Sequence, residues 1–415
     1  MMARKTKKIR TFLLCLGFFI LTACDPESAP QSTVEAGVKS LTAAQRSPAE
    51  LYQEHCAQCH EGGFPKAPHS ITFHMIGAKA ILRSMTDGVM QLAAEPLKTA
   101  DLRRLAEYLG QDSLDSPRVQ PLKMCNADVA TRDLGQAPES SDWGFDLQNT
   151  RFIPAGIADL GASDIPKLKL KWAFAYPNAT RARSQPVIAG STVFMGSHDG
   201  TVYSLNLMSG CVLWTFKADA EVRSAITVEA PQNGGKRLEP SVYFGDFIGQ
   251  VYAVNADTGS LLWKSSLEDH ANVTITGSPK LHKDRLYVPM SSTEWASAAI
   301  PDYECCTFRG GKAAFDTNDG RMLLKSHTIS EESRPTGTKN SAGAAMWAPA
   351  GAPIWGSPTI DEKRNLIYAG TGQAYTSPAA ASSDSIIAFN LDTGKIEWVW
   401  QATEGDAWNM SCFIG

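Results

Sequence analysis

The chain has 415 residues, of which 43% are hydrophobic and 20% are charged, and its formal net charge is −4. This composition is typical of a soluble globular protein, and the length leaves room for two or more cores. The only dense basic run is MMARKTKKIR at the amino terminus, so the sequence predicts no nucleic-acid partner.

A secretory leader is predicted at residues 1–24. The basic start runs into the apolar stretch TFLLCLGFFILTA, which is too short to span a membrane as a helix and is typical of a signal peptide. The ending LTAC resembles a bacterial lipobox, which predicts a periplasmic protein anchored to the membrane by a lipid on Cys24. The alternative is an ordinary signal peptide in which Cys24 has no role. Residues 25–47, rich in Ser, Ala, Pro and Gln, favour a flexible tether.

A haem-attachment motif follows, Cys56-Ala-Gln-Cys59-His60. In c-type cytochromes two cysteines at this spacing hold the haem through thioether bonds, and the histidine after them binds the iron. Zinc is the alternative, but no second pair of ligands follows at the spacing of a zinc finger. The sequence therefore predicts a covalent haem c on Cys56, Cys59 and His60, in a small all-α cytochrome c domain at residues 48–112.

The sixth ligand of the haem iron is predicted to be Met90. A pattern that resembles Thr-x-Gly-x-Met is typical of cytochrome c domains ahead of their last helix. This chain has that pattern at residues 86–90, before the amphipathic stretch TADLRRLAEYLG at residues 99–110. Met75 and Met85 are the alternatives, since any of the three methionines can instead be a core residue. Ligation by histidine and methionine would give an electron-transfer haem.

Beyond a linker at residues 113–139, a repeated hairpin pattern predicts an all-β propeller at residues 140–415. Four stretches combine an apolar strand, a turn rich in Asn, Asp and Gly, and a second strand that usually ends in Trp: VYSLNLMSGCVLW, VYAVNADTGSLLW, AAFDTNDGRMLL and IIAFNLDTGKIEW. Their turn glycines, separated by 49, 61 and 74 residues, are Gly210, Gly259, Gly320 and Gly394. This spacing indicates propeller blades, with the tryptophans packed between neighbouring blades.

These hairpins resemble the repeats of quinoprotein dehydrogenases, which bind pyrroloquinoline quinone (PQQ) on the axis of an eight-bladed propeller. A closer resemblance is to the cytochrome-fused, PQQ-dependent polyvinyl alcohol dehydrogenases, a quinohaemoprotein alcohol dehydrogenase family, in DWGFDLQNTRF, LKLKWAFAYP, SGCVLW, CCTFRG, KNSAG, WGSPT and GDAWN. It covers nearly the whole chain after the leader. Eight blades of roughly 45 residues need about 360 residues, whereas 273 run from Trp143 to Gly415. We therefore expect either a smaller propeller or, preferably, one that lacks its C-terminal blades.

The resemblance implies a PQQ site centred on the adjacent Cys305 and Cys306. The interval between turn glycines lengthens here, which indicates an insertion on the axial face, and export favours a disulfide over two free thiols. In the family such a disulfide lies flat against the quinone, and Trp355 matches the tryptophan on its other face. The candidate donors to the oxygens of the quinone are Arg223, Thr276, Arg309 and Lys339. Each of these donors has a structural hydrogen bond as its alternative role.

The resemblance also implies a calcium ion and a catalytic carboxylate. Glu294 resembles the calcium-binding glutamate, and the second protein ligand falls on Gln373, which offers a carbonyl oxygen on a longer side chain. The catalytic aspartate of the family falls near Asn409, and an amide cannot take a proton. Asp406, three residues earlier, is therefore the candidate base.

The function implied by the resemblance is the oxidation of alcohols, secondary alcohols and polyvinyl alcohol among them, to ketones in the periplasm. Electrons would pass from PQQ through haem c to a periplasmic acceptor such as a cytochrome. Two alternatives stay open, a catalytically defective or truncated homologue and a lipid-anchored propeller scaffold for envelope assembly. By the same resemblance Cys125 is expected to pair with Cys211, and Cys412 to lack a partner in this chain.

Overall fold

The computed structural model describes residues 46–61, 67, 70, 73, 77–88, 90–115, 122–126, 134, 142–177, 181–230 and 239–413. The predicted leader and tether, with the lipidation site Cys24, lie outside these residues, and so does Met75. Within the described ranges no helix is both long enough and apolar enough to cross a membrane.

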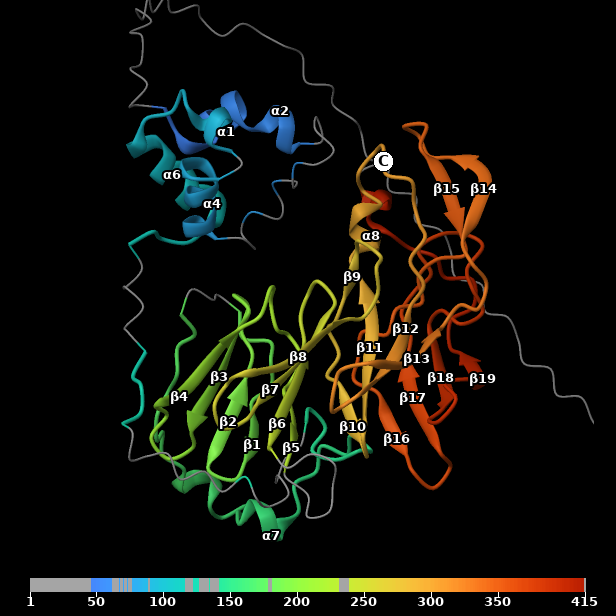
Figure 1. Cartoon of the computed structure of the whole chain (residues 1–415). Helices are drawn as coiled ribbons and strands as arrows, with labels where there is room; N and C mark the ends of the chain where they lie inside the picture. The colour runs from blue at the N-terminus through green and yellow to red at the C-terminus, as the bar shows by residue number, and fades with distance from the viewer. Residues whose placement is uncertain are drawn as a thin grey trace, which may run out of the picture. The chain divides into compact units, whose positions relative to one another are not determined.

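The amino-terminal part of the described chain is helical. Its helices are α1 (Pro48–His55), α2 (Ala57–His60), α4 (Ala78–Thr86), α5 (Gln91–Ala94) and α6 (Thr99–Gly110) (Figure 1). α1 begins with a capping box, because the Ser47 hydroxyl accepts the backbone NH of Glu50 while the Glu50 carboxylate accepts the NH of Ser47. α6 coincides with the predicted amphipathic stretch and buries Leu102 and Leu105. The helical segment is thus confirmed, whereas its identity as a cytochrome c domain stays a prediction.

The rest of the described chain contains five antiparallel sheets, of which four have four or five consecutive strands and one is the two-stranded hairpin described below. The first contains β1 (Val187–Ala189), β2 (Thr192–Met195), β3 (Thr201–Asn206) and β4 (Val212–Lys217). The second contains β5 (Thr227–Glu229), β6 (Ser241–Gly245), β7 (Gln250–Asn255) and β8 (Leu261–Ser266). The third contains β9 (Val273–Thr274), β10 (Lys280–His282), β11 (Arg285–Ser292), β12 (Gly311–Asp316) and β13 (Met322–His327). The fourth contains β16 (Thr359–Asp361), β17 (Leu366–Gly370), β18 (Ser385–Asn390) and β19 (Ile396–Gln401).

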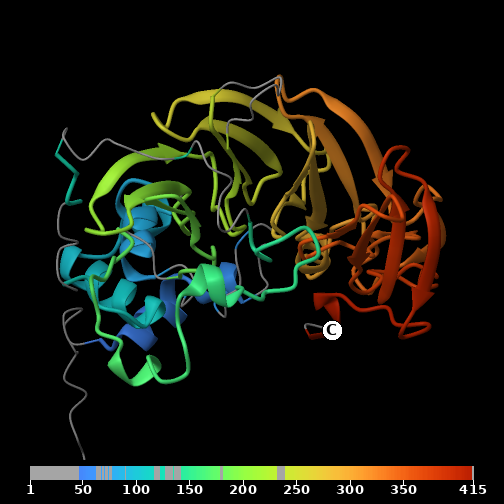
Figure 2. The same ribbon diagram turned by 90° about the horizontal axis from the view of Figure 1, so that it is seen from below.

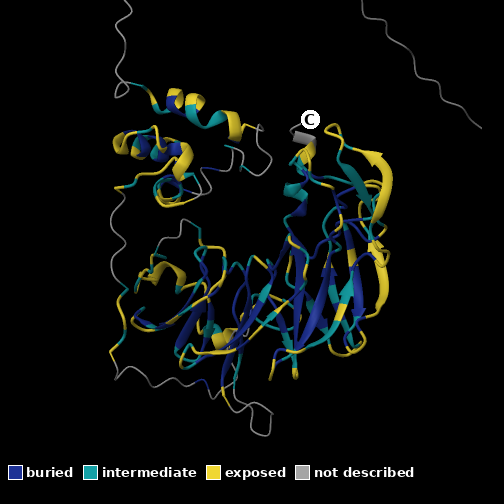
Figure 3. Ribbon diagram, turned by 45° about the horizontal axis from the view of Figure 1, so that its top comes forward, coloured by how far each residue is buried: buried dark blue, intermediate teal, exposed yellow. Residues whose placement is uncertain are grey.

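The four sheets follow one another around an arc, as the blades of a propeller do (Figure 2). A separate hairpin, β14 (Arg334–Lys339) with β15 (Ala345–Ala348), is inserted between the third and fourth sheets. β14 is exposed along its whole length, and so is most of β19 (Figure 3). Short helical turns fill other connections, namely α7 (Ala155–Ala158), η4 (Ile165–Lys167), α8 (Glu294–Ser297) and η5 (Met410–Phe413). The propeller-like fold predicted from the sequence is confirmed.

The predicted hairpins are confirmed as β3–β4, β7–β8, β12–β13 and β18–β19. Their turn glycines all have a positive φ, which is +73° at Gly259 and favours glycine over other residues. A Cβ atom at Gly259 would also lie 2.8 Å from the indole of Trp214 in the preceding sheet. Trp214 Nε1 donates to the carbonyl of Ala256 at 2.9 Å, and Trp263 Nε1 makes the same contact at 2.8 Å with the carbonyl of Thr317, which directly follows β12 of the third sheet. These tryptophans therefore pack between neighbouring sheets, as predicted.

A segment that precedes the first sheet is bound to the third and fourth sheets. Lys280 Nζ, on β10, donates to Asp142 Oδ1 and to the carbonyl of Asp146, both at 2.7 Å, and the ion pair is fully buried. Burial raises the pKa of Asp142 and lowers that of Lys280, in spite of their attraction, because a charge is costly away from water. Asn149 Nδ2 donates to Thr359 Oγ1 on β16 at 2.9 Å. This segment joins sheets that are far from it in the sequence.

The predicted disulfide between Cys125 and Cys211 is present. It fastens residues 122–126 to the start of β4, where the backbone NH of Cys125 also donates to the carbonyl of Val212 at 2.9 Å. The side chain of Cys412 lies outside the described residues.

Candidate active site

Cys305 and Cys306 lie between α8 and β12 and form the expected disulfide across a cis peptide bond. Both are buried, with 3% and 0% of their surface exposed, in a core that includes Phe308 and Tyr375. The backbone NH of Trp347 on β15 donates to the carbonyl of Cys305 at 2.7 Å, and the NH of Cys306 donates back to the carbonyl of Trp347 at 3.3 Å. The inserted hairpin therefore holds the cysteine pair in place.

Glu294, at the start of α8, anchors the segment that follows the cysteine pair. Its buried carboxylate accepts the backbone NH of Thr307 and of Phe308, each at 2.8 Å, and the hydroxyl of Tyr303 at 2.9 Å. Burial alone would raise the pKa of this carboxyl group, but hydrogen bonds from His270 and the two backbone NH groups outweigh it, and the pKa is lowered.

Three protein donors use most, but not all, of the roughly four hydrogen-bonding sites of the Glu294 carboxylate. Gln373, the other predicted ligand, is half-buried, and its backbone carbonyl accepts the NH of Ala352 at 2.9 Å. No group of three or more His, Cys, Asp or Glu side chains in the described part of the chain is placed to hold a metal ion. Calcium therefore stays a prediction, and no step proposed below depends on it.

Thr276 and Trp355 are brought together by the structure. The Thr276 hydroxyl donates to the backbone carbonyl of Trp355 at 2.9 Å and lies 3.0 Å from the hydroxyl of Ser291. The indole of Trp355 packs against Gly372, where a Cβ atom would come within 3.0 Å of Trp355 Nε1. Thr276 therefore fixes the backbone from which the Trp355 ring projects.

Arg223 belongs to a basic cluster that the sequence analysis did not find. Its guanidinium lies 3.7 Å from the ring centroid of Phe247, and its Nε is 2.9 Å from Glu221 Oε2. Arg183 Nη1 is 3.0 Å from the other oxygen of Glu221, and the charge of Arg181 acts on Arg223. Burial lowers the pKa of Arg223. The stretch TRARSQP before the first sheet contains two of these arginines, and it was the feature of the sequence that could have indicated the cluster.

This basic cluster fits the carboxylates of PQQ. Arg183 and Arg223 both pair with Glu221, and Arg181 adds a third positive charge that acts on Arg223, so the cluster carries an excess of positive charge. Guanidinium groups hold carboxylates with well-directed, charge-assisted hydrogen bonds. A planar quinone that bears three carboxylates therefore matches the donors present.

Two other predicted donors have different surroundings. Arg309 Nη1 donates to the backbone carbonyls of residues 329–331 at 3.3–3.5 Å. Lys339 is exposed at the end of β14. Arg309 therefore fastens the connection after β13, and the role of Lys339 at the cofactor stays a prediction.

The predicted base, Asp406, is exposed and interacts with a second carboxylate, Asp384. Burial, and then the charge of Asp406, raises the pKa of Asp384, whose Oδ2 is buried with no hydrogen-bond partner in the described chain. Asn409 is buried, and its Nδ2 donates to the carbonyl of Tyr375 at 2.7 Å. The sequence analysis missed Asp384, because nothing in SSDSIIAF marks this residue as near to Asp406.

A cavity of about 290 Å³, here called the inner chamber, lies beside Asn409 and Tyr375. Met346 of β15 also lines it, and Met346 forms a β-bridge with Cys305. Ala407, which directly follows Asp406, contributes another part of the wall. The inner chamber is thus lined by a bridge partner of Cys305 and by a chain neighbour of the candidate base.

The haem motif lies in the helical segment. Cys56 falls between α1 and α2, Cys59 and His60 lie in α2, and both cysteines are free. The buried His60 ring packs edge-on against Phe73 with 4.9 Å between ring centroids. Cys56 and Met90 pack against the same core as Phe73. These residues fit a haem c, because the attachment cysteine and both proposed iron ligands adjoin one apolar core.

Comparison with known proteins gives a match over most of the chain. Residues 141–412 match the β-propeller domain model of the PQQ glucose/ethanol/alcohol dehydrogenases. The chain is 35% identical to the polyvinylalcohol dehydrogenase of Sphingopyxis sp. (strain 113P3), over 93% of this chain and 60% of that protein. It is 34% identical to the polyvinylalcohol dehydrogenase of Pseudomonas sp., over 88% of this chain and 58% of that protein.

Among solved structures, the quinohemoprotein alcohol dehydrogenase from Comamonas testosteroni matches with a TM-score of 0.51 and 21% identity. The match covers 70% of this chain and 45% of that chain, and at this identity it shows the fold alone. The chain spans about 60% of the length of the two curated relatives.

Proposed function

The chain belongs to the family of PQQ glucose/ethanol/alcohol dehydrogenase β-propellers, and we propose that it oxidises alcohols with bound PQQ as the electron acceptor. The family match over residues 141–412 carries this proposal. Two relatives at 34% and 35% identity are named for polyvinylalcohol. The proposed substrates are therefore secondary alcohols, polyvinyl alcohol included, and the proposed products are ketones.

The basic cluster of Arg181, Arg183 and Arg223 binds the carboxylates of PQQ in this proposal. The disulfide of Cys305 and Cys306 and the ring of Trp355 flank the plane of the cofactor. When bound, PQQ supplies the chemistry of a two-electron acceptor. Each alcohol that becomes a ketone releases two electrons and two protons.

Asp384 and Asp406 are the proposed acceptor of the hydroxyl proton. Burial, and then the charge of Asp406, raises the pKa of Asp384. A raised pKa makes a carboxylate a better proton acceptor than an ordinary one. The position of Asp406 directly before Ala407, in the wall of the inner chamber, supports this role.

The electrons leave through a haem c on Cys56 and Cys59, with His60 and Met90 as the proposed iron ligands. A haem with both axial positions filled transfers electrons one at a time. The proposed location is the periplasm, with a lipid anchor on Cys24, and the proposed acceptor is a periplasmic protein such as a cytochrome. The leader and the attachment motif in the sequence support this part of the proposal.

The test uses the full chain, exported in a host that attaches haem c. The purified protein is mixed with PQQ and a secondary alcohol such as 2-pentanol, and the haem α-band is followed. We expect the haem to become reduced only when both PQQ and alcohol are present. A haem that stays oxidised while the protein binds no PQQ would contradict the proposal and favour a defective homologue.

Two variants separate the sites. Cys59→Ala should abolish haem reduction but preserve alcohol-dependent reduction of a soluble dye. Arg223→Ala should weaken PQQ binding, measured by equilibrium dialysis, by about 10–100-fold, since one charge-assisted contact is worth about 1.5–3 kcal/mol. Arg364→Ala is the matched control, because Arg364 is exposed and pairs only locally with Asp361; it should bind PQQ as the parent does.

A further inference from the structure

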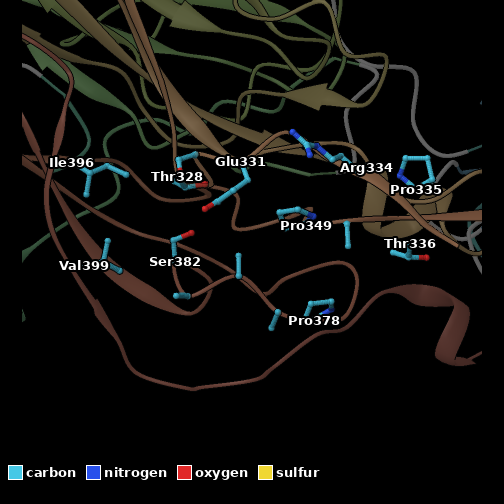
Figure 4. Close-up of a pocket in the computed structure, with 15 residues that line it drawn as sticks. Thr328, Glu331, Arg334, Pro335, Thr336, Pro349, Pro378, Ser382, Ile396 and Val399 are labelled. Atoms are coloured by element: carbon cyan, nitrogen blue, oxygen red, sulfur yellow. The ribbon is translucent and has the colours of Figure 1, made fainter. Parts of the chain in front are cut away.

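A second and larger cavity, here called the outer chamber, lies between the inserted hairpin and the connection from β17 to β18. Its volume is about 680 Å³. Ile396 and Val399 of β19 lie at one end of it, and Pro335 and Thr336 of β14 lie at the other (Figure 4). The chamber is therefore elongated, and its long direction leads from the outermost strand of the fourth sheet toward the inserted hairpin.

The outer and inner chambers share two walls. Thr336 lines both cavities, so both use β14 as one wall. Ser377 lines the inner chamber, and its neighbour Pro378 lines the outer one, so the same connection provides the opposite wall of both. The two cavities therefore adjoin each other along these walls, and together they are called the groove here. The inner end of the groove is lined by Met346, the bridge partner of Cys305, and by Ala407, the chain neighbour of Asp406.

The lining of the outer chamber selects for a neutral ligand with both apolar and hydroxyl groups. Small apolar side chains, from Pro349 and the alanines at 379–381 to Val399, make up much of the wall. Hydroxyl groups of Thr336 and Ser382 interrupt this apolar surface. The two charged side chains, Glu331 and Arg334, have opposite signs, so the wall has no net charge that would attract an ion.

The volumes of the two chambers indicate the size of ligand that each can hold. At about 30 Å³ per water molecule, the inner chamber has the space of roughly ten waters, which is sufficient for an alcohol of a few carbon atoms. The outer chamber adds the space of roughly twenty more. A small alcohol would leave that space empty, whereas a long hydroxylated chain would fill it.

We propose that the outer chamber binds the unreacted part of a polymeric alcohol while one carbinol group of the same chain occupies the inner chamber. This inference rests on the proposed function for its chemistry but not for the binding itself. Its ligand class is a linear, uncharged hydrocarbon chain with repeated hydroxyl groups. Binding far from the reacting carbon raises the efficiency for long substrates alone.

The test compares a long and a short alcohol on the same protein. In Ala379→Phe a ring enters the outer chamber, and we expect the ratio of kcat/KM for polyvinyl alcohol to kcat/KM for 2-pentanol to fall by about tenfold or more. Ala342→Phe is the matched control, because Ala342 is exposed at the tip of the inserted hairpin and lines neither chamber. Its ratio should stay within about twofold of the parent's.

A direct measurement of polymer binding tests the groove without requiring that the protein oxidise any alcohol. Isothermal titration of the full chain with short polyvinyl alcohol, without added PQQ, should show binding that Ala379→Phe weakens and Ala342→Phe preserves. Val399→Lys places a charge in the same wall on an exposed strand, where folding tolerates it, and it should weaken binding as well. Dextran, a polysaccharide, should bind less tightly than polyvinyl alcohol.

The outcomes separate the two proposals. Weakened polymer binding without oxidation of any alcohol would support the groove and contradict the proposed function. Suppose that Ala379→Phe and Val399→Lys still oxidise 2-pentanol, keep the parent's ratio of kcat/KM for the two alcohols, and bind the polymer as the parent does. This result would overturn polymer binding in the groove and leave the proposed function standing. Tighter binding of dextran than of polyvinyl alcohol would overturn the assigned ligand class.

Discussion

Replacing Lys312 by methionine is expected to stabilise the protein. Lys312 lies on β12 with 1% of its surface exposed, and its ammonium group has no hydrogen-bond partner among the described residues. The nearest compensation is the ring of Phe389, whose centroid is 4.9 Å from Nζ, followed by Tyr287 at 5.7 Å. Methionine keeps an unbranched side chain of similar length and removes the charge.

The magnitude follows from the pKa of Lys312, which burial, and to a smaller extent Arg285, lowers from 10.5 to about 8. A lowering of this size corresponds to roughly 3 kcal/mol against the charged form in the folded state. The two rings return about 0.5–2 kcal/mol through cation–π attraction. We therefore expect Lys312→Met to raise the free energy of unfolding by about 1–3 kcal/mol at pH 7.

The sign of the pH dependence is also determined. Because the folded pKa lies below the unfolded value, the penalty is complete below about pH 8 and disappears as the pH rises to about 10.5. The parent should therefore gain stability between pH 8 and 10 relative to Lys312→Met. Urea denaturation followed by tryptophan fluorescence at pH 7, 8 and 9.5 measures both effects.

Lys325→Met on β13 is the control, because Lys325 is about one-third exposed and pairs with Glu268 at the surface. It should change the free energy of unfolding by no more than about 1 kcal/mol. If Lys312→Met lowers stability at pH 7, or if its difference from the parent is the same at pH 7 and 9.5, then burial of an uncompensated charge is the wrong description of this site.

Three further changes test other contacts. Lys280→Met removes the ammonium group that faces the buried Asp142 carboxylate and should cost about 3–5 kcal/mol in urea denaturation. The double variant Lys280→Met/Asp142→Leu should recover most of this loss, and a double variant as unstable as the single one would argue against the explanation. Glu294→Gln should flatten the loss of stability on acidification below about pH 4.5, because the lowered pKa of Glu294 makes its stabilising contribution disappear as the pH falls through the folded value; an unchanged acid titration would show that Glu294 does not anchor the cysteine segment. Gly259→Val should cost about 2–4 kcal/mol, since it combines an unfavourable φ with a clash against Trp214, and a thermal melt equal to the parent's would contradict that packing.

The hairpins could be predicted from the sequence because their determinants are local. A turn with φ of +73° at Gly259 is specified by a few adjacent residues, and Trp214 stacks against that same turn. The third hairpin ends in leucine instead of tryptophan, and in the structure Leu324 takes the equivalent position, 3.2 Å from a Cβ atom built at Gly394. A large apolar residue at this place is therefore sufficient for packing.

The inserted hairpin and the buried charges could not be predicted, for physical reasons. β14 is exposed along its length, so the stretch RPTGTK has no alternation of apolar and polar residues to mark a strand. Lys280 resembles a surface lysine until Asp142, 138 residues earlier, is placed beside it. The carboxylate pair of Asp384 and Asp406 and the arginines before the first sheet likewise come together only in the folded chain.

The segment that contains Asp142 and Asn149 also constrains the order of folding. Asn149 contacts Thr359 across 210 residues of sequence, and such long-range contacts slow folding because a large loop must close first. At about 5–20 residues per second of synthesis, the partner of Asn149 is made about 10–40 s after it. The sheets can form in their order along the chain, but the early segment cannot complete its contacts until the third and fourth sheets have been made. Its docking is therefore expected to be among the last steps of folding.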